Sequence, residues 1–251
     1  MKLLRFTILA VCLMMTAHVL AQSDLRSELL SYEKSDSTAE VSITIEWPVS
    51  GGSQALIDSI QGYINVVSGA AIMGRESLND FGESEFAALS SSWQETYAND
   101  EEPGAAFWKT INITKTTETR RYVTYNCLLT DFAGGIHGFA SRFGCTFRKS
   151  DGKIIPLLAV TDSPQLDALI KKGIMSYFEV TTDEDLANEL FGDDVDNLPL
   201  PGEAPYLTDT GIVFIYSQYE IAPYSAGMIT FEIPFNDIRP FLTPEAQELL
   251  P

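Results

Sequence analysis

Apolar and polar residues alternate most regularly near the C-terminus of the chain. Between residues 229 and 235, every odd position holds Ile or Phe, and the positions between them hold Thr, Glu and Pro. This two-residue period predicts a strand with one buried face. An earlier strand is expected after Tyr206, and between the two lies the segment Tyr219–Gly227, of sequence YEIAPYSAG. Because Pro223 fixes the backbone and lacks an amide donor, we expect this segment to interrupt the final hairpin.

Two further strands, over 122–129 and 142–148, flank the turn-rich sequence DFAGGIHGFAS. The odd positions of both are apolar or Cys, so they share one face. A hairpin centred near Ile136 places Cys127 directly opposite Cys145. In an oxidising compartment this predicts a disulfide between them. Two reduced, buried thiols are the alternative.

The rest of the chain alternates between helical and extended patterns. Apolar residues at helical spacing predict helices over 56–67, 86–97 and 164–177, with Tyr177 in the buried stripe of the third. Short alternating runs predict strands over 41–47, 107–117 and 154–158, after a polar lead at the N-terminus. We expect an α+β fold with antiparallel strands covered by helices on one side. We expect the mature chain to form two fused α+β halves, residues 22–150 and 151–251, which pack as one unit.

The first 21 residues have the pattern of a secretory signal peptide. Lys2 and Arg5 precede the apolar run Phe6–Met15, and small residues end the segment at Ala21. We therefore expect cleavage after Ala21, export to the periplasm or the medium, and no membrane span in the mature chain. A lipoprotein attached at Cys12 is the alternative.

Acidic residues dominate the composition. The chain has 35 Asp and Glu against 16 Lys and Arg, for a net charge of −19. Cleavage of the signal peptide removes Lys2 and Arg5, so the net charge of the mature chain is 14 − 35 = −21. Such a charge repels phosphate backbones and therefore excludes nucleic acid as a partner, while it attracts cationic proteins. Solubility outside the cell is the simpler interpretation of the same charge.

Candidate catalytic groups are few. His137 is the only histidine left once His18 departs with the leader, so a site with several histidine ligands is excluded. A histidine base needs an orienting partner and a nucleophile within reach. Asp209-Thr210-Gly211 has the triplet of aspartic proteases, but it falls where a hairpin turn is needed. The sequence predicts no catalytic residue, metal or cofactor, and hence no enzyme.

Three motifs resemble a bacterial domain-of-unknown-function family. They are the loop Gly134-Gly135-Ile136-His137-Gly138, the turn Ser150-Asp151-Gly152-Lys153, and YEIAPYSAG followed by Ile233-Pro234. That family supplies the extracytoplasmic region of RsiV-type anti-sigma factors, which sense lysozyme, and a non-catalytic region of PdaC-type peptidoglycan deacetylases. Ile136 departs from the small residue expected before the histidine. The chain has neither a sigma-binding segment nor a deacetylase domain, so those two activities are not carried over.

The same motifs contain the candidate binding residues. Aromatic rings beside a carboxylate suit a sugar or a basic protein, which favours a recognition surface at His137, Tyr219, Glu220 and Tyr224. The remaining motif residues are expected to shape the loops: Gly134, Gly135, Gly138, Pro223 and Gly227. The alternative is a turn held in place by its tyrosines.

Three functions follow from these observations. The sequence and the resemblance favour an exported, non-enzymatic envelope module that binds glycan fragments or a cationic protein such as lysozyme. A structural or assembly component of the envelope and a hydrolase of unknown type remain as alternatives.

Overall fold

The computed structural model describes residues 24–192 and 194–251, so the expected leader at 1–21 lies outside the described residues. A five-stranded sheet forms the N-terminal half, in the order β1-β2-β3-β4-β5. Its strands are β1 (Arg26–Ser35), β2 (Ala39–Ser50), β3 (Phe107–Glu118), β4 (Tyr122–Phe132) and β5 (Phe139–Arg148). Neighbouring strands are antiparallel except β2 and β3, which are parallel. The fold is the expected α+β class, with one parallel pair that the sequence did not predict.

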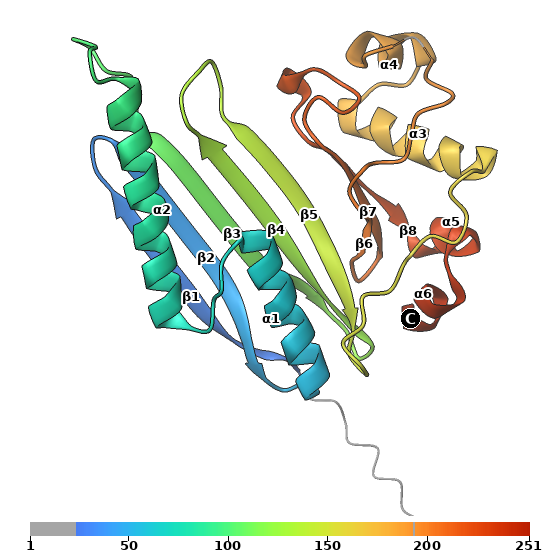
Figure 1. Ribbon diagram of the computed structural model, residues 1–251. Coiled ribbons are helices and arrows are strands. Elements are labelled where there is room, and N and C mark those ends of the chain that lie inside the picture. Colours follow the sequence, from blue (N-terminus) through green and yellow to red (C-terminus); the bar gives the residue numbers. More distant parts are fainter. Residues whose placement is uncertain (1–23, 193) are drawn as a thin grey trace, which may run out of the picture.

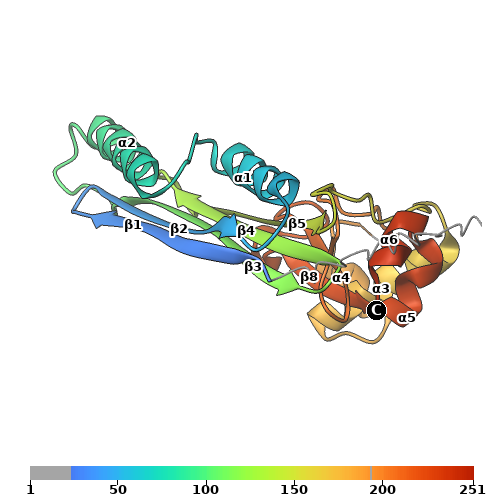
Figure 2. The ribbon, with the colours of Figure 1, turned by 90° about the horizontal axis from the view of Figure 1, so that it is seen from below.

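Two helices between β2 and β3 cover one face of this sheet (Figure 2). The first is α1 (Gln54–Ser68), which begins where the Ser53 hydroxyl accepts a hydrogen bond from the Leu56 amide and ends at Gly69 in the left-handed conformation. The second is α2 (Arg75–Thr96), longer at its N-terminal end than the helix predicted from the aromatic stripe. A crossover of this kind permits the parallel pairing of β2 with β3.

The C-terminal half has a smaller antiparallel sheet, in the order β6-β7-β8 (Figure 1). Its strands are β6 (Tyr206–Leu207), β7 (Gly211–Tyr216) and β8 (Ile229–Pro234). The helices around it are α3 (Pro164–Phe178), α4 (Asp183–Glu189), α5 (Phe235–Ile238), α6 (Pro244–Leu249) and the 3-10 turns η1 (Tyr224–Ala226) and η2 (Arg239–Phe241). The predicted alternation of buried and exposed residues in β8 is confirmed, since Ile229, Phe231 and Ile233 are buried.

The two halves meet where β6 lies against β4 and β5. The Leu207 amide donates to the Thr146 hydroxyl at 2.9 Å, and the Thr124 hydroxyl donates to the Leu207 carbonyl at 2.8 Å. Both threonines are buried. A Cβ at Gly144 would lie only 2.3 Å from the Tyr206 ring, so β5 needs glycine at this crossing. These contacts make a seam, defined here as Thr124, Gly144, Thr146, Tyr206 and Leu207, between the halves.

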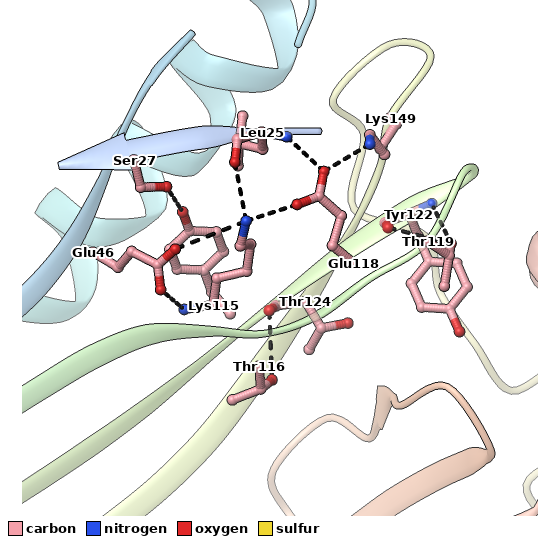
Figure 3. A network of polar contacts seen from close by, with 11 residues as sticks. Leu25, Ser27, Glu46, Lys115, Thr116, Glu118, Thr119, Tyr122, Thr124 and Lys149 are labelled. Atoms are coloured by element: carbon pink, nitrogen blue, oxygen red, sulfur yellow. Dashed lines mark hydrogen bonds and ion pairs between the residues drawn. The ribbon is translucent and has the colours of Figure 1, made fainter. Parts of the chain in front are cut away.

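A partly buried charge network lies at the end of β3 (Figure 3). The Glu118 carboxylate accepts hydrogen bonds from the Leu25 amide, the Lys115 ammonium and the Lys149 ammonium, each at 2.7 Å. Lys149 is fully buried, and Glu46 lies 3.8 Å from Lys115. Burial raises the pKa of Glu118, but the two lysines and the amide donor outweigh it and hold the pKa below its usual value.

The hairpin β4–β5 has a different register from the predicted one. Cys127 pairs with Phe143 and Cys145 pairs with Tyr125, a slip of two residues that keeps both sulfurs on the same face. The two cysteines are diagonal neighbours, and both are free, buried thiols. The expected direct cross-strand disulfide is therefore wrong for this structure, because a diagonal pair separates the side chains further than an opposed pair.

Three other expectations need correction. The polar N-terminal lead contains the edge strand β1. Residues 154–158 form only isolated bridges, Ile154 with Phe147 and Leu158 with Leu242, in place of a strand. Tyr177 is 37% exposed and so lies outside the buried stripe of α3. In each case the sequence pattern is short or mixed, and packing from distant segments decides the outcome.

Candidate functional site

The connection between β4 and β5 projects an apolar tip. Gly134 and Gly135 have φ of 92° and 93°, a conformation that side chains oppose and that turns the chain sharply. Ile136 follows, with 98% of its surface exposed, and Phe139 is 52% exposed at the start of β5. Gly138 is required for a different reason, because a Cβ there would lie 2.7 Å from the Asp131 carbonyl oxygen. The strands thus hold an unburied isoleucine away from the sheet.

A second loop, between β7 and β8, meets this tip from the C-terminal half. Tyr219 is 53% exposed and has φ of 65°, which is uncommon for a residue other than glycine. Pro223 precedes the 3-10 turn η1, and Gly227 ends it with φ of 71°. Tyr224 lies at the first position of that turn. The loop therefore presents both tyrosines to the hairpin.

The His137 ring joins the two loops. It stacks on Tyr224, with ring centroids 3.8 Å apart and an interplanar angle of 17°. Its Nε2 lies 3.2 Å from the Tyr219 hydroxyl, and its Nδ1 lies 3.0 Å from the Gly138 carbonyl oxygen. The Tyr224 hydroxyl donates to that same carbonyl at 2.8 Å. Three of the four residues expected at the binding surface are thus brought together, although His137 and Tyr219 are 82 residues apart in the chain.

The protonation of His137 follows from these partners. A carbonyl oxygen only accepts, so Nδ1 carries the hydrogen and donates to Gly138. In the neutral ring Nε2 then accepts from the Tyr219 hydroxyl.

Glu220, the fourth expected residue, turns away from the aromatic rings. Its carboxylate accepts from the Gly202 amide and the Ser217 amide, each at 2.7 Å, and so holds the turn that carries Tyr219. Burial and the nearby Glu220 carboxylate raise the pKa of Glu203. These two contacts make Glu220 a support for the loop that carries Tyr219.

The structure adds three residues that the sequence did not assign to the site. Ile136 and Phe139 supply its exposed apolar area. Gln218 ties the loops together, because its Oε1 accepts from the Ala140 amide at 3.0 Å. The sequence did contain one indication of this exposed apolar area, because Ile136 is an apolar residue within a glycine-rich turn. We call Ile136, His137, Phe139, Tyr219 and Tyr224 the tip surface.

The described residues supply neither a metal cluster nor a membrane-spanning helix. Among them, no three or more His, Cys, Asp and Glu side chains are grouped so as to hold a metal ion. In the same part of the chain, no helix combines the length and apolar character that crossing a bilayer requires.

The fold is of the α+β class, and comparison with solved structures agrees. Residues 158–236 match the model of the DUF3298 family, described as proteins of unknown function. A structure of a DUF3298 family member from Bacteroides fragilis has a TM-score of 0.75 and 19% identity, covering 91% of this chain and 98% of that one. A DUF3298 family protein from Pseudomonas aeruginosa PAO1 has a TM-score of 0.60 and 16% identity, covering 92% and 99%. No curated protein matches the chain. At these identities the structures show the fold alone.

Proposed function

We propose that the protein is an exported envelope recognition module that binds a cationic protein, with lysozyme as the model ligand, through the tip surface. The observation that carries the proposal is the exposed apolar tip: Ile136 is 98% exposed, and Tyr219 and Phe139 are each more than half exposed. Recognition surfaces are enriched in such aromatic and apolar anchors. A solvent-facing isoleucine on a rigid hairpin contributes nothing to the core of the monomer.

Charge favours a basic partner. The net charge of −19 for the full sequence creates a field that draws cationic proteins toward the module and raises the rate of encounter. The leader pattern at the N-terminus supports export to the envelope, where the resemblance to lysozyme-sensing regions also points. Attraction of this kind weakens with salt, because the Debye length is about 8 Å at physiological ionic strength.

A direct binding measurement tests the proposal. The protein is titrated calorimetrically with hen lysozyme and with soluble peptidoglycan fragments, at low and at physiological salt. Ile136→Ser removes the apolar tip, and Met73→Ser is the matched control, because Met73 is a loop residue with 83% exposure on another part of the molecule. We expect lysozyme binding that weakens at least about tenfold in Ile136→Ser, as for an interface hot spot, and not in Met73→Ser. Binding of glycan alone, or equal loss in both variants, would overturn the proposal.

The tyrosine contacts need a separate control, because they also hold the loops together. Tyr224→Ala removes the ring that stacks on His137 and the hydroxyl that reaches Gly138. If Tyr224→Ala lowers the melting temperature but leaves lysozyme affinity unchanged, the stack is a structural latch only. Loss of binding with the melting temperature retained places Tyr224 in the contact surface.

A further inference from the structure

A cleft of about 560 Å³ lies beside the tip surface in the C-terminal half. The end of α3, the end of α4 and the turn η1 surround it, and these elements lie together at the top of that half in Figure 1. The lining groups used below are Tyr177, Glu179, Asn188, Glu189, Ser225 and Ala226. Its volume falls within the range of small-ligand sites, about 300–1,000 Å³.

Two helices end at this cleft, and residues of both C-terminal ends line it. α3 ends at Phe178 with Glu179 as its C-cap, and Glu189 is the last residue of α4. The last turn of a helix carries partial negative charge, which basic residues often balance. Neither of these two helices has a basic residue in its last turn. Carboxylates stand at both ends instead, so the cleft concentrates negative potential.

An aromatic ring is fixed at the edge of the same cleft. The Tyr177 hydroxyl donates to the Ala226 carbonyl at 2.7 Å, and the ring makes an edge contact with Phe178, with centroids 5.2 Å apart. Tyr177 remains 37% exposed. An aromatic ring in the lining of an acidic cleft is a suitable contact for an organic cation. Asn188 adds an amide group to the lining.

We propose that this cleft binds one alkylammonium or guanidinium group, supplied by a Lys or Arg side chain of a partner protein. The two carboxylates and the helix ends neutralise the charge, and Tyr177 contacts the alkyl stem or the cationic head. A metal ion fits less well, because the described residues form no group of three His, Cys, Asp or Glu ligands, whereas calcium takes six to eight oxygens.

The cleft and the tip surface share the turn η1, where residues 223, 225 and 226 line the cleft and Tyr224 belongs to the tip surface. Tyr224 stacks on His137 at one side of η1, while its neighbours Ser225 and Ala226 line the cleft at the other. A partner seated on Ile136 therefore has the cleft within reach of a second contact. This inference rests on the proposed function for the identity of the partner, but the cleft itself is tested without one.

The test uses Nα-acetyl-lysine methylamide and Nα-acetyl-arginine methylamide as probes, followed by ¹H–¹⁵N NMR of the protein. We expect shifts of the amides at 177–179, 188–189 and 223–226 at millimolar probe. Glu179→Gly removes one carboxylate at a position with φ of 57°, where glycine is favoured, so this variant stays folded. It and Glu189→Gln should each weaken probe binding at least fivefold.

Glu184→Gln is the matched control, because it removes one charge from the first turn of α4, at the other end of that helix. Equal weakening by Glu184→Gln would reduce the effect to net charge and overturn the inference. So would an absence of shifts in the cleft, or the same shifts with Ca²⁺ alone.

Lysozyme titration then separates this inference from the proposed function. Suppose that Glu179→Gly and Glu189→Gln bind lysozyme as well as the wild type does, while Ile136→Ser does not. The cleft is then not a contact for the partner, and the proposal that the tip surface binds lysozyme is retained. Probe binding in the cleft without lysozyme binding by the wild type overturns the proposed function and keeps the cation site.

Discussion

The partly buried carboxylate of Glu118 offers a quantitative test of how the N-terminal half is held together. We predict that Glu118→Gln destabilises the protein strongly at pH 7. Glu118 is 12% exposed and Lys149 is 0% exposed, so the substitution removes one carboxylate partner of a fully buried ammonium group. Breaking a buried pair on one side costs about 3–5 kcal/mol. For a protein of this size, about 2–4 °C of melting temperature is lost per kcal/mol, which corresponds to roughly 6–20 °C.

Urea unfolding of both proteins, followed by circular dichroism, measures the difference in free energy. Glu28→Gln is the matched control, because it breaks the Arg75–Glu28 pair, whose side chains are 55% and 50% exposed. Exposed pairs contribute about 0–1 kcal/mol. If Glu118→Gln costs no more than Glu28→Gln, the buried network does not stabilise the fold as argued.

The sign of the pH dependence follows from the lowered pKa of Glu118. A carboxylate with a lower pKa in the folded than in the unfolded state stabilises the protein above the unfolded value, about 4.3 for Glu. That contribution is lost as pH falls through the folded-state pKa. The stability gap between wild type and Glu118→Gln should therefore be full at pH 7 and should shrink below about pH 4. A gap that widens in acid would contradict the assignment.

Three further predictions concern packing and thiol chemistry. Gly144→Ala places a methyl group against the Tyr206 ring, 2.3 Å away before relaxation, and should cost about 1–3 kcal/mol in thermal or urea unfolding; an unchanged stability would show that β6 does not press on β5. Gly62→Ala, in α1 with nothing within 4 Å of the new Cβ, should instead stabilise by about 0.5–1 kcal/mol, and destabilisation would contradict the open environment. Burial raises the pKa of Cys127 and Cys145 to about 12, so both should resist a disulfide reagent at pH 8 in the native protein and react in urea; rapid native labelling, or two missing thiols in the unreduced mature protein, would refute this.

Local patterns predicted those elements whose own residues decide their structure. The strand over 229–235 shows strict alternation, and it forms β8 with its odd positions buried. The β4–β5 hairpin was placed correctly, but its register depends on the glycine-rich turn, and the pairing moved by two residues. The edge strand β1 was missed because only two of its ten residues, Leu30 and Tyr32, are buried. Its backbone pairing with β2 stabilises the extended conformation, which the pattern of its own residues does not predict.

The tip surface was only partly readable from the sequence. Tyrosines 219 and 224 and His137 stood out in the motifs, but nothing local says that the two loops touch. Their contact depends on the seam, where Thr124 and Thr146 bind the backbone of Leu207 across the join. The supporting role of Glu220 was not predicted, because its partner Gly202 lies in a segment without any motif.

Stability and the proposed recognition are separable at this surface, because the proposal assigns them to different residues. His137 covers one face of Tyr224, and the Tyr224 hydroxyl is satisfied by Gly138, so this pair acts mainly to fix the relative position of the two loops. Ile136 lies at the tip and is 98% exposed, so its removal leaves the fold intact. If the proposal is right, substitution of Ile136 lowers the affinity for the partner directly. Substitution of Tyr224 lowers it indirectly, by changing the relative position of the two loops. Affinity that follows Tyr224 but ignores Ile136 would mean that the partner contacts the loop from the cleft side.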